Sequence, residues 1–225
     1  AAALYGIQAA EGAVIITTKK GKDGASVISY SGSISVDNIL GTPNVQTQYG
    51  QGEQIVGGTG TTINTDSPLS WGNSTAGSPV FNNIKDFYDT AITSNHSVSY
   101  SGGNAKSNVY FSIGDVSQDG TIESTSYDKT SFRINTSSNI NDNLTLGVSA
   151  NYITTKTNST KQGNASGSSF LSLLGYPANV NASDFLNSDK SQKAFFLDQQ
   201  FDNPYWSIEN SPNTDEVNRL IGAVS

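Results

Sequence analysis

Hydrophobic and polar residues alternate one by one along several segments of the chain. In the first of these segments, Ile28, Tyr30, Gly32, Ile34 and Val36 alternate with four serines. Successive side chains of a β-strand point to opposite faces of the sheet. The segment therefore predicts a strand with one mainly apolar face and one face of hydroxyl groups.

Further segments repeat this pattern. Together they predict strands at about 26–37, 95–103, 106–117, 128–139 and 143–156, and a sixth that starts near Val217 with its facing left open. Short turns at 103–106 and 140–143 alternate with longer connections at 37–95, 115–128 and 155–216. Very long connections are uncommon in compact soluble domains. Short turns on one rim and long loops on the other are typical of outer-membrane barrels.

Three features favour a transmembrane antiparallel β-barrel over a soluble β-sandwich. The alternating runs last about 9–11 residues, the length that a tilted strand needs to cross a bilayer. The polar face is rich in Ser, Thr, Asn and Gly, which suits a hydrated or filled lumen. Arg133 falls on the polar face. Asp115 and Asp128 share the apolar parity and are expected at strand ends, where a charge that faces lipid costs least.

The long connections carry weaker signals of helical structure. Phe81, Ile84, Phe87, Tyr88 and Ile92 have roughly helical spacing. The segment from Phe170 to Leu174, stopped by a glycine and a proline, predicts a short helix. Ser183 is expected to cap another turn that runs through Leu186.

Composition and charge exclude several classes of protein. The chain has no cysteine, so disulfides, zinc–thiolate clusters and cysteine nucleophiles are excluded. Its net charge of −7 argues against nucleic-acid binding. No apolar run approaches the ~20 residues of a membrane-spanning helix. The chain also has no methionine, and Ala1 falls inside an apparent motif, so we expect an internal segment of a longer protein.

The most specific motif lies at the start of the chain. Residues 3–21 read ALYGIQAAEGAVIITTKKG, with Glu11 where asparagine is common. This stretch resembles the plug-to-barrel junction of the SusC/RagA family of TonB-dependent transporters. Stretches at 84–88, 95–104, 127–128, 203–206 and 215–219 reinforce the resemblance, and they follow in the expected order over nearly the whole chain.

The resemblance implies a fold and a function. Residues 1–24 would be the C-terminal end of a plug domain, and 25–225 the first five or six strands of a barrel of 22, with the long connections outside the cell. The family imports oligosaccharides or peptides across the outer membrane of Bacteroidetes-type bacteria. A SusD-like lipoprotein acts as its lid, and the TonB complex, whose contact motif lies upstream of this chain, supplies the energy.

Few residues suggest chemistry. His96, the single histidine, has only Ser and Asn beside it and is expected near the rim, at the start of a strand. Trp71, Tyr205 and Trp206 lie in long connections, where aromatic rings could contact cargo or the lid. No catalytic residue, metal site or cofactor is expected. Tyr30, Tyr100 and Tyr152 share the apolar parity and are candidates for the aromatic girdles of a barrel.

Two alternatives remain from the sequence. One is a siderophore or vitamin receptor of the same superfamily, against which the junction motif argues. The other is a secreted β-rich adhesin or carbohydrate-binding module, which would also show alternating strands. An enzyme is disfavoured, because no nucleophile–base pair or metal-ligand constellation appears.

Overall fold

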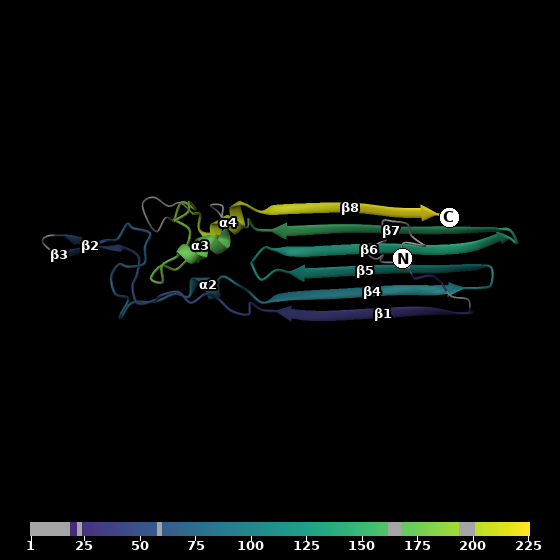
Figure 1. Ribbon diagram of the computed structural model, residues 1–225, viewed down its shortest axis with the longest axis horizontal. Coiled ribbons are helices and arrows are strands. Elements are labelled where there is room, and N and C mark those ends of the chain that lie inside the picture. The colour runs from purple at the N-terminus through teal and green to yellow at the C-terminus, as the bar shows by residue number, and fades with distance from the viewer. Residues whose placement is uncertain (1–18, 22–23, 58–59, 162–167, 194–200) are drawn as a thin grey trace, which may run out of the picture.

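A six-stranded antiparallel sheet dominates the computed structural model, which describes residues 19–21, 24–57, 60–161, 168–193 and 201–225. The strands follow the order β1 (Gly24–Asp37), β4 (Ala91–Gly103), β5 (Ser107–Asp119), β6 (Ser126–Asn141), β7 (Leu144–Ser159) and β8 (Asn213–Val224). The long connections gather at one end of the sheet and the tight turns at the other (Figure 1). The described sheet is open, with β1 and β8 at its edges.

The six predicted strands are confirmed, and most are longer than the sequence indicated. The prediction of a long connection at 115–128 is wrong, because β5 and β6 remain paired as far as Asp119 and Ser126. Asp115 therefore lies inside a strand and not at its end. Thr130 of the neighbouring strand donates a hydrogen bond of 2.9 Å to its carboxylate, and Ser117 does the same for Asp128.

One face of the sheet, here called the apolar face, carries the predicted hydrophobic side chains. The register aligns Tyr30, Val98, Ile113, Phe132, Tyr152 and Leu220 in a single row across all six strands. Ile28 is 75% exposed, and Phe111, Ile134 and Leu146 are each about 40% exposed. The described structure places no second layer over these side chains, so they do not form the dry interior of a sandwich.

The opposite face, here called the polar face, is more sheltered. It carries Ser29, Ser99, Ser112 and Arg133 in one register row. In the next row, Tyr110 and Asn135 are buried. The facing of β8, which the sequence left open, is now defined: Leu220 lies on the apolar face and Arg219 on the polar face.

The long connections contain short elements. Those at the loop end are the hairpin β2 (Glu53–Gly57) and β3 (Gly60–Asn64) and the helices α2 (Asn83–Asp86), α3 (Ser169–Gly175) and α4 (Pro204–Asn210). The sequence indicated α3 correctly. The helix suggested over 81–92 is reduced to α2, because Ile92 already belongs to β4. The turn expected from Ser183 to Leu186 does not become helical, and Leu186 instead forms an antiparallel bridge with Gln192.

The main hydrophobic core lies in these connections and not in the sheet. Ile84, Phe87, Leu173 and Ile208 are buried together, and Tyr88, Ile122 and Tyr205 pack against them. These side chains come from three connections that are far apart in the sequence. The connections therefore form one packed unit, here called the loop cluster.

Candidate functional site

Asn83 holds two connections of the loop cluster together. Its buried side-chain amide donates to the carbonyl of Val180 at 2.8 Å and accepts from the backbone amide of Ala182 at 2.9 Å. Both partners lie almost 100 residues further along the chain. A buried side-chain amide is stable only when its groups are paired, so this contact fixes the first long connection against the third.

Asn203 does the same within the third connection. Its side-chain oxygen accepts from the backbone amides of Tyr205 and Trp206, which caps α4, and Pro204 fits the first turn of that helix. Its nitrogen donates to the carbonyl of Ala182 and to the hydroxyl of Tyr176. The Asn-Pro pair is a helix-start signal in the sequence that could have predicted α4.

The three candidate cargo or lid contacts lie in two places. Tyr205 stacks on Phe185, with ring centroids 5.8 Å apart, and meets Phe87 edge to face at 5.1 Å. Its ring is therefore largely part of the loop-cluster core. Trp206 follows on the same helix and is half-buried. Trp71 lies in a separate segment beside Tyr49 and is 57% exposed, which makes it the most available of the three. A role in contacting cargo or a lid stays a prediction for all three.

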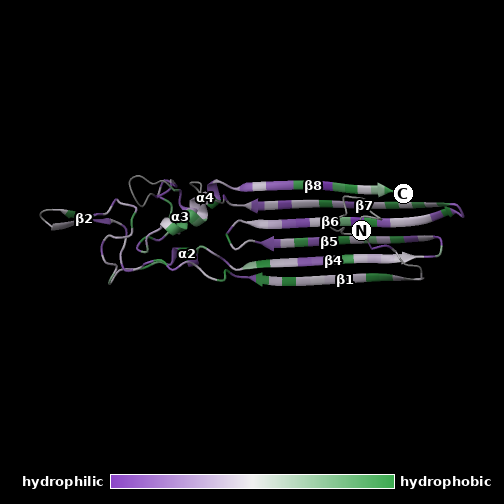
Figure 2. Cartoon of the chain, in the orientation of Figure 1, coloured by the Kyte–Doolittle hydropathy of each residue, from purple (hydrophilic) through white to green (hydrophobic). Residues whose placement is uncertain are grey.

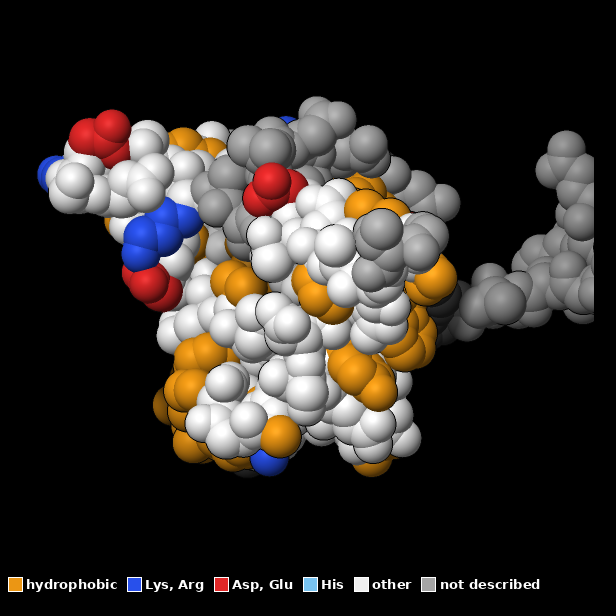
Figure 3. Space-filling view, turned by 90° about the vertical axis from the view of Figure 1, so that its left-hand side faces the viewer, with side chains coloured by type: hydrophobic (Ala, Val, Ile, Leu, Met, Phe, Trp, Pro, Cys, Tyr) orange, Lys and Arg blue, Asp and Glu red, His pale blue; other side chains and the backbone are white. Residues whose placement is uncertain are grey.

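The surface of the loop end is mostly polar and uncharged. Figure 3 views this end and shows several hydrophobic side chains among uncharged polar atoms, with few charged groups. The ion pair between Lys193 and Asp184, at 2.6 Å, is one exposed exception. A surface of this kind suits hydrogen bonding and ring stacking better than long-range charge attraction.

His96 lies in the middle of β4 and on the apolar face, so its expected place at the start of a strand is wrong. The strand begins five residues earlier, at Ala91. The ring nitrogen Nδ1 lies 2.7 Å from the hydroxyl of Tyr30, and the two rings are stacked. The pairing joins β4 to the neighbouring strand β1.

Tyr30, Tyr100 and Tyr152 all lie on the apolar face, as their parity predicted, and each hydroxyl has a partner on an adjacent strand. Tyr30 pairs with His96 and Tyr152 with Asn218, both nearer the loop end. Tyr100 pairs with Ser26, nearer the tight turns. Glycines make room for two of the rings: a Cβ on Gly32 or Gly102 would lie about 2.5 Å from the Tyr30 or Tyr100 hydroxyl. The hydroxyl groups of Tyr30 and Tyr152 thus point along their strands towards the loop end, and that of Tyr100 towards the tight turns.

The described end of the junction motif, residues 19–21, lies against the polar face. The Asn135 side chain donates a 2.7 Å hydrogen bond to the carbonyl of Lys19. A Cβ on Gly21 would lie 2.5 Å from the backbone nitrogen and oxygen of Val109. Only glycine permits this close approach of one backbone to another.

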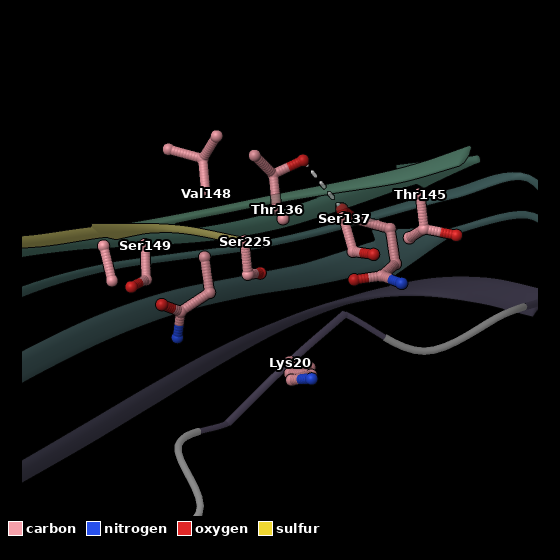
Figure 4. Close-up of a pocket in the computed structure, with 11 residues that line it drawn as sticks. Lys20, Thr136, Ser137, Thr145, Val148, Ser149 and Ser225 are labelled. Carbon is pink, nitrogen blue, oxygen red and sulfur yellow. Dashed lines mark hydrogen bonds between the residues drawn. The ribbon is translucent and has the colours of Figure 1, made fainter. Parts of the chain in front are cut away.

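A cavity of about 400 Å³ lies between the junction and the sheet. Figure 4 shows Lys20 opposite Ser137, Ser149 and Thr145, with Val148 pointing to the other side of the sheet. The chain therefore enters the sheet along its polar face. The rest of the motif, residues 1–18, lies outside the described residues.

The described residues contain no group of three or more His, Asp or Glu side chains that could hold a metal ion. None of the helices in the described ranges is long and apolar enough to span a membrane.

Fold and junction together define a class of chain: a sheet of long antiparallel strands with a loop cluster at one end. The described part of the junction, residues 19–21, lies against the polar face of this sheet. No protein-family model matches the chain.

The TonB-dependent receptor SusC of Bacteroides thetaiotaomicron is 25% identical over 226 residues, which cover 96% of this chain and 21% of the receptor. A solved structure of the RagAB peptide importer in its closed-closed state shares the fold with a TM-score of 0.63 and 22% identity, over 98% of this chain and 28% of that chain. The two matches confirm the predicted SusC/RagA resemblance: the chain is similar in sequence to SusC and shares its fold with a chain of the RagAB structure. It spans about a fifth of the curated relative's length.

Replacing Asn203 with alanine should loosen the loop cluster. The change removes the cap of α4 and leaves the Ala182 carbonyl without its side-chain donor, at a combined cost of roughly 2–3 kcal/mol. We expect limited proteolysis of the 160–212 connection in the full-length protein to accelerate roughly thirtyfold or more. Asn44→Ala, an exposed residue with no hydrogen bond in the described structure, should stay within about twofold of wild type. Equal rates for the two variants would contradict the role of Asn203.

Replacing Asn135 with alanine should release the junction from the polar face. Loss of the bond to the Lys19 carbonyl, worth about 1–1.5 kcal/mol, should raise hydrogen exchange in residues 19–21 by roughly tenfold. Asn151→Ala makes the same chemical change on the same face of the next strand. Asn151 has no hydrogen bond to residues 19–21, the described part of the junction, so its replacement should leave exchange unchanged. Unchanged exchange in Asn135→Ala would show that the junction is held by other contacts.

The loop cluster should weaken at high pH through Tyr176. Burial raises the pKa of Tyr176 to about 12, partly offset by the hydrogen bond from Asn203. The folded cluster thus keeps this proton to a higher pH than the unfolded chain, whose tyrosines titrate near ~10. Stability is full below pH ~10 and falls as the pH rises towards ~12. Thermal melts followed by tryptophan fluorescence should show a shallower alkaline decline in Tyr176→Phe, and identical slopes would contradict the assignment.

Proposed function

We propose that the chain is the plug-to-barrel junction and first wall segment of a TonB-dependent transporter of the outer membrane. Residues 1–24 finish the plug and 25–225 begin the barrel, with the loop cluster outside the cell. The observation that carries the proposal is the apolar face: a long row of uncovered hydrophobic side chains on a sheet whose other face is polar.

An apolar face of this size is unfavourable in water. Soluble monomers rarely expose contiguous apolar patches beyond a few hundred Å², and here Ile28, Ile34 and Leu220 are each more than 70% exposed. A hydrocarbon environment removes this cost. The polar face then lines the interior, where hydroxyl and amide groups contact water or the plug.

The apolar belt also crosses the strands at a slant. On β1 it is centred near Gly32, which aligns through the register with Thr154 of β7, whereas the belt on β7 is centred near Val148, six residues away. Over four strand steps this is a shift of about 1.5 residues per strand. With ~3.3 Å per residue and ~4.8 Å between strands, the belt makes an angle of roughly 45° with the perpendicular to the strands. Strands tilted by about this angle in a flat bilayer would produce such a belt.

The rims of the belt support the same conclusion. The hydroxyl group of Tyr152 points to the loop-end rim and that of Tyr100 to the opposite rim, as interfacial tyrosines do. The hydroxyl group of Tyr30 instead lies over Gly32, at the centre of the belt on β1. Hydropathy changes along the strands accordingly: in Figure 2, β8 is hydrophilic near the loops and hydrophobic towards its C-terminal end. Asp115 and Asp128 lie on the loop side of the belt, where a charge in lipid costs least.

The open edges of the sheet call for further strands. Lipid cannot satisfy the unpaired backbone groups of β1 and β8, so we infer that other strands of the full-length protein close a barrel of about 22 strands. A SusD-like lipoprotein lid, the TonB complex and an oligosaccharide or peptide cargo belong to the same proposal. One matched structure is that of a peptide importer, and for this chain the proposal keeps both cargo classes.

The two faces can be tested with adjacent substitutions in the full-length protein. Val98→Arg places a charge on the apolar face and should cost roughly 2–4 kcal/mol at mid-membrane. Heat-modifiable barrel in the outer-membrane fraction should therefore decrease strongly. Ser97→Arg places the same charge on the polar face beside Ser31 and Gly114, and should assemble at close to the wild-type level.

Equal assembly of both variants would contradict a lipid-facing apolar face. Purification of the full-length protein as a stable monomer without detergent would favour a secreted adhesin or carbohydrate-binding module instead. Iron- or vitamin-dependent expression together with uptake of a chelate would favour a siderophore or vitamin receptor.

A further inference from the structure

The polar face carries an unusual concentration of positive charge. Both arginines of the chain, Arg133 and Arg219, lie on this face, and Lys129 lies there with them. The chain as a whole has a net charge of −7. The charge of these three side chains is therefore opposite in sign to the net charge of the chain.

The charges of β5 to β8 are segregated between the two faces. The polar face carries Lys129, Arg133 and Arg219 against one acid, Asp215. The apolar face, beyond the belt, carries Asp115, Asp119, Asp128 and Glu216 against one cation, Lys156. Lys156 pairs with Glu216 at 3.3 Å. None of the three cations on the polar face forms an ion pair with another described residue.

The register places these three cations close enough to share a ligand. Arg133 and Arg219 lie on the strands on either side of β7. Arg219 aligns through Ile153 with Ser131, so it is offset by two residues from Arg133 along the strands. Strand spacing puts their Cα atoms roughly 12 Å apart, and Lys129 lies at about the same distance from each. The long side chains can converge over Ser131 and Ile153, which lie between them in the register.

The triangle lies on the route between the loop cluster and the junction. Arg133 is two residues from Asn135, which holds Lys19, and is on the loop side of it. Towards β1 this register row continues with Ser112, Ser99 and Ser29, and towards β8 with Asn151 and Ile221. A solute that moves from the loop end towards the junction along this wall thus meets mainly neutral side chains, one acid (Asp215) and one cationic patch.

We propose that Lys129, Arg133 and Arg219 form a binding site for carboxylate groups of the cargo, so that the transporter favours acidic oligomers. The proposal rests on the proposed function and names its substrate class. Guanidinium groups bind carboxylates through two parallel hydrogen bonds, and such charge-assisted bonds are about twice as strong as neutral ones. A cationic patch in a narrow, partly dry lumen also concentrates anions near it.

A thiol at the centre of the triangle measures the local potential directly. Ile153→Cys is made in a cysteine-free background of the full-length protein, purified in detergent with its lipoprotein partner. Its rates of modification by an anionic and a cationic methanethiosulfonate of similar size are compared. We expect the anionic-to-cationic rate ratio to exceed by about tenfold the ratio at Ser99→Cys, which lies among serines on the same face.

Charge variants separate the patch from its surroundings. Arg133→Gln combined with Arg219→Gln should bring the ratio at position 153 to within about twofold of the Ser99→Cys control. The matched pair Arg133→Lys and Arg219→Lys should retain most of it. If the ratio equals that of the control with both arginines present, the patch is already neutralised, for example by plug carboxylates, and the proposal is overturned.

The ligand is tested with named probes. Penta-glutamate and penta-galacturonate, at millimolar concentration, should slow modification of the introduced thiol several-fold, whereas penta-glutamine and penta-galactose should not. Protection by one acidic probe supports the site and identifies the backbone that it accepts. Equal effects of acidic and neutral probes, or no protection by either, would overturn it. These modification rates can be measured without transport. The test of the carboxylate site can therefore fail while the Val98 and Ser97 substitutions still support the membrane location, and the reverse is also possible.

Discussion

The central constraint on this chain is an apolar face that no part of the described structure covers. Six strands present Val, Ile, Leu, Phe and Tyr side chains on one side, and Ser, Thr, Asn and Arg on the other. A soluble sheet would bury the first set beneath a second layer. Here the packed core is the small loop cluster around Leu173. The proposed function accounts for the uncovered face with hydrocarbon, and for the open edges with further strands of the full-length protein.

The same constraint separates the roles of the two ends. At the loop end, Asn83 fastens the first long connection to the third through buried amide contacts, and Asn203 braces the third connection. Towards the other end, Gly21 and Asn135 bring the N-terminal segment onto the polar face. In the proposed function, the strands between these ends form a wall with lipid on its apolar side and a passage along its polar side. Lys129, Arg133 and Arg219 lie on the side of that passage.

Strands could be predicted from sequence far better than loops. Period-two alternation is a local signal that is present in each strand separately, and it located all six strands of the sheet. The strand ends were less certain, because Ser, Thr and Asp continue β5 and β6 through cross-strand hydrogen bonds such as that of Thr130 with Asp115. The loop cluster was largely missed, since Ile84, Leu173 and Ile208 meet only through long-range packing. The junction contact of Asn135 with Lys19 likewise joins residues 116 positions apart and has no local signature.

The central claim can be tested most directly by the depth of individual residues in a bilayer. Spin labels are placed one at a time along β5 and β7 of the full-length protein in lipid vesicles, and collision rates with oxygen and with a water-soluble nickel chelate are measured. Oxygen contact should peak at alternate residues, over 109–113 on β5 and over 144–152 on β7, with nickel contact lowest at the same positions. Equal access of the nickel chelate to both faces of these strands would contradict the account.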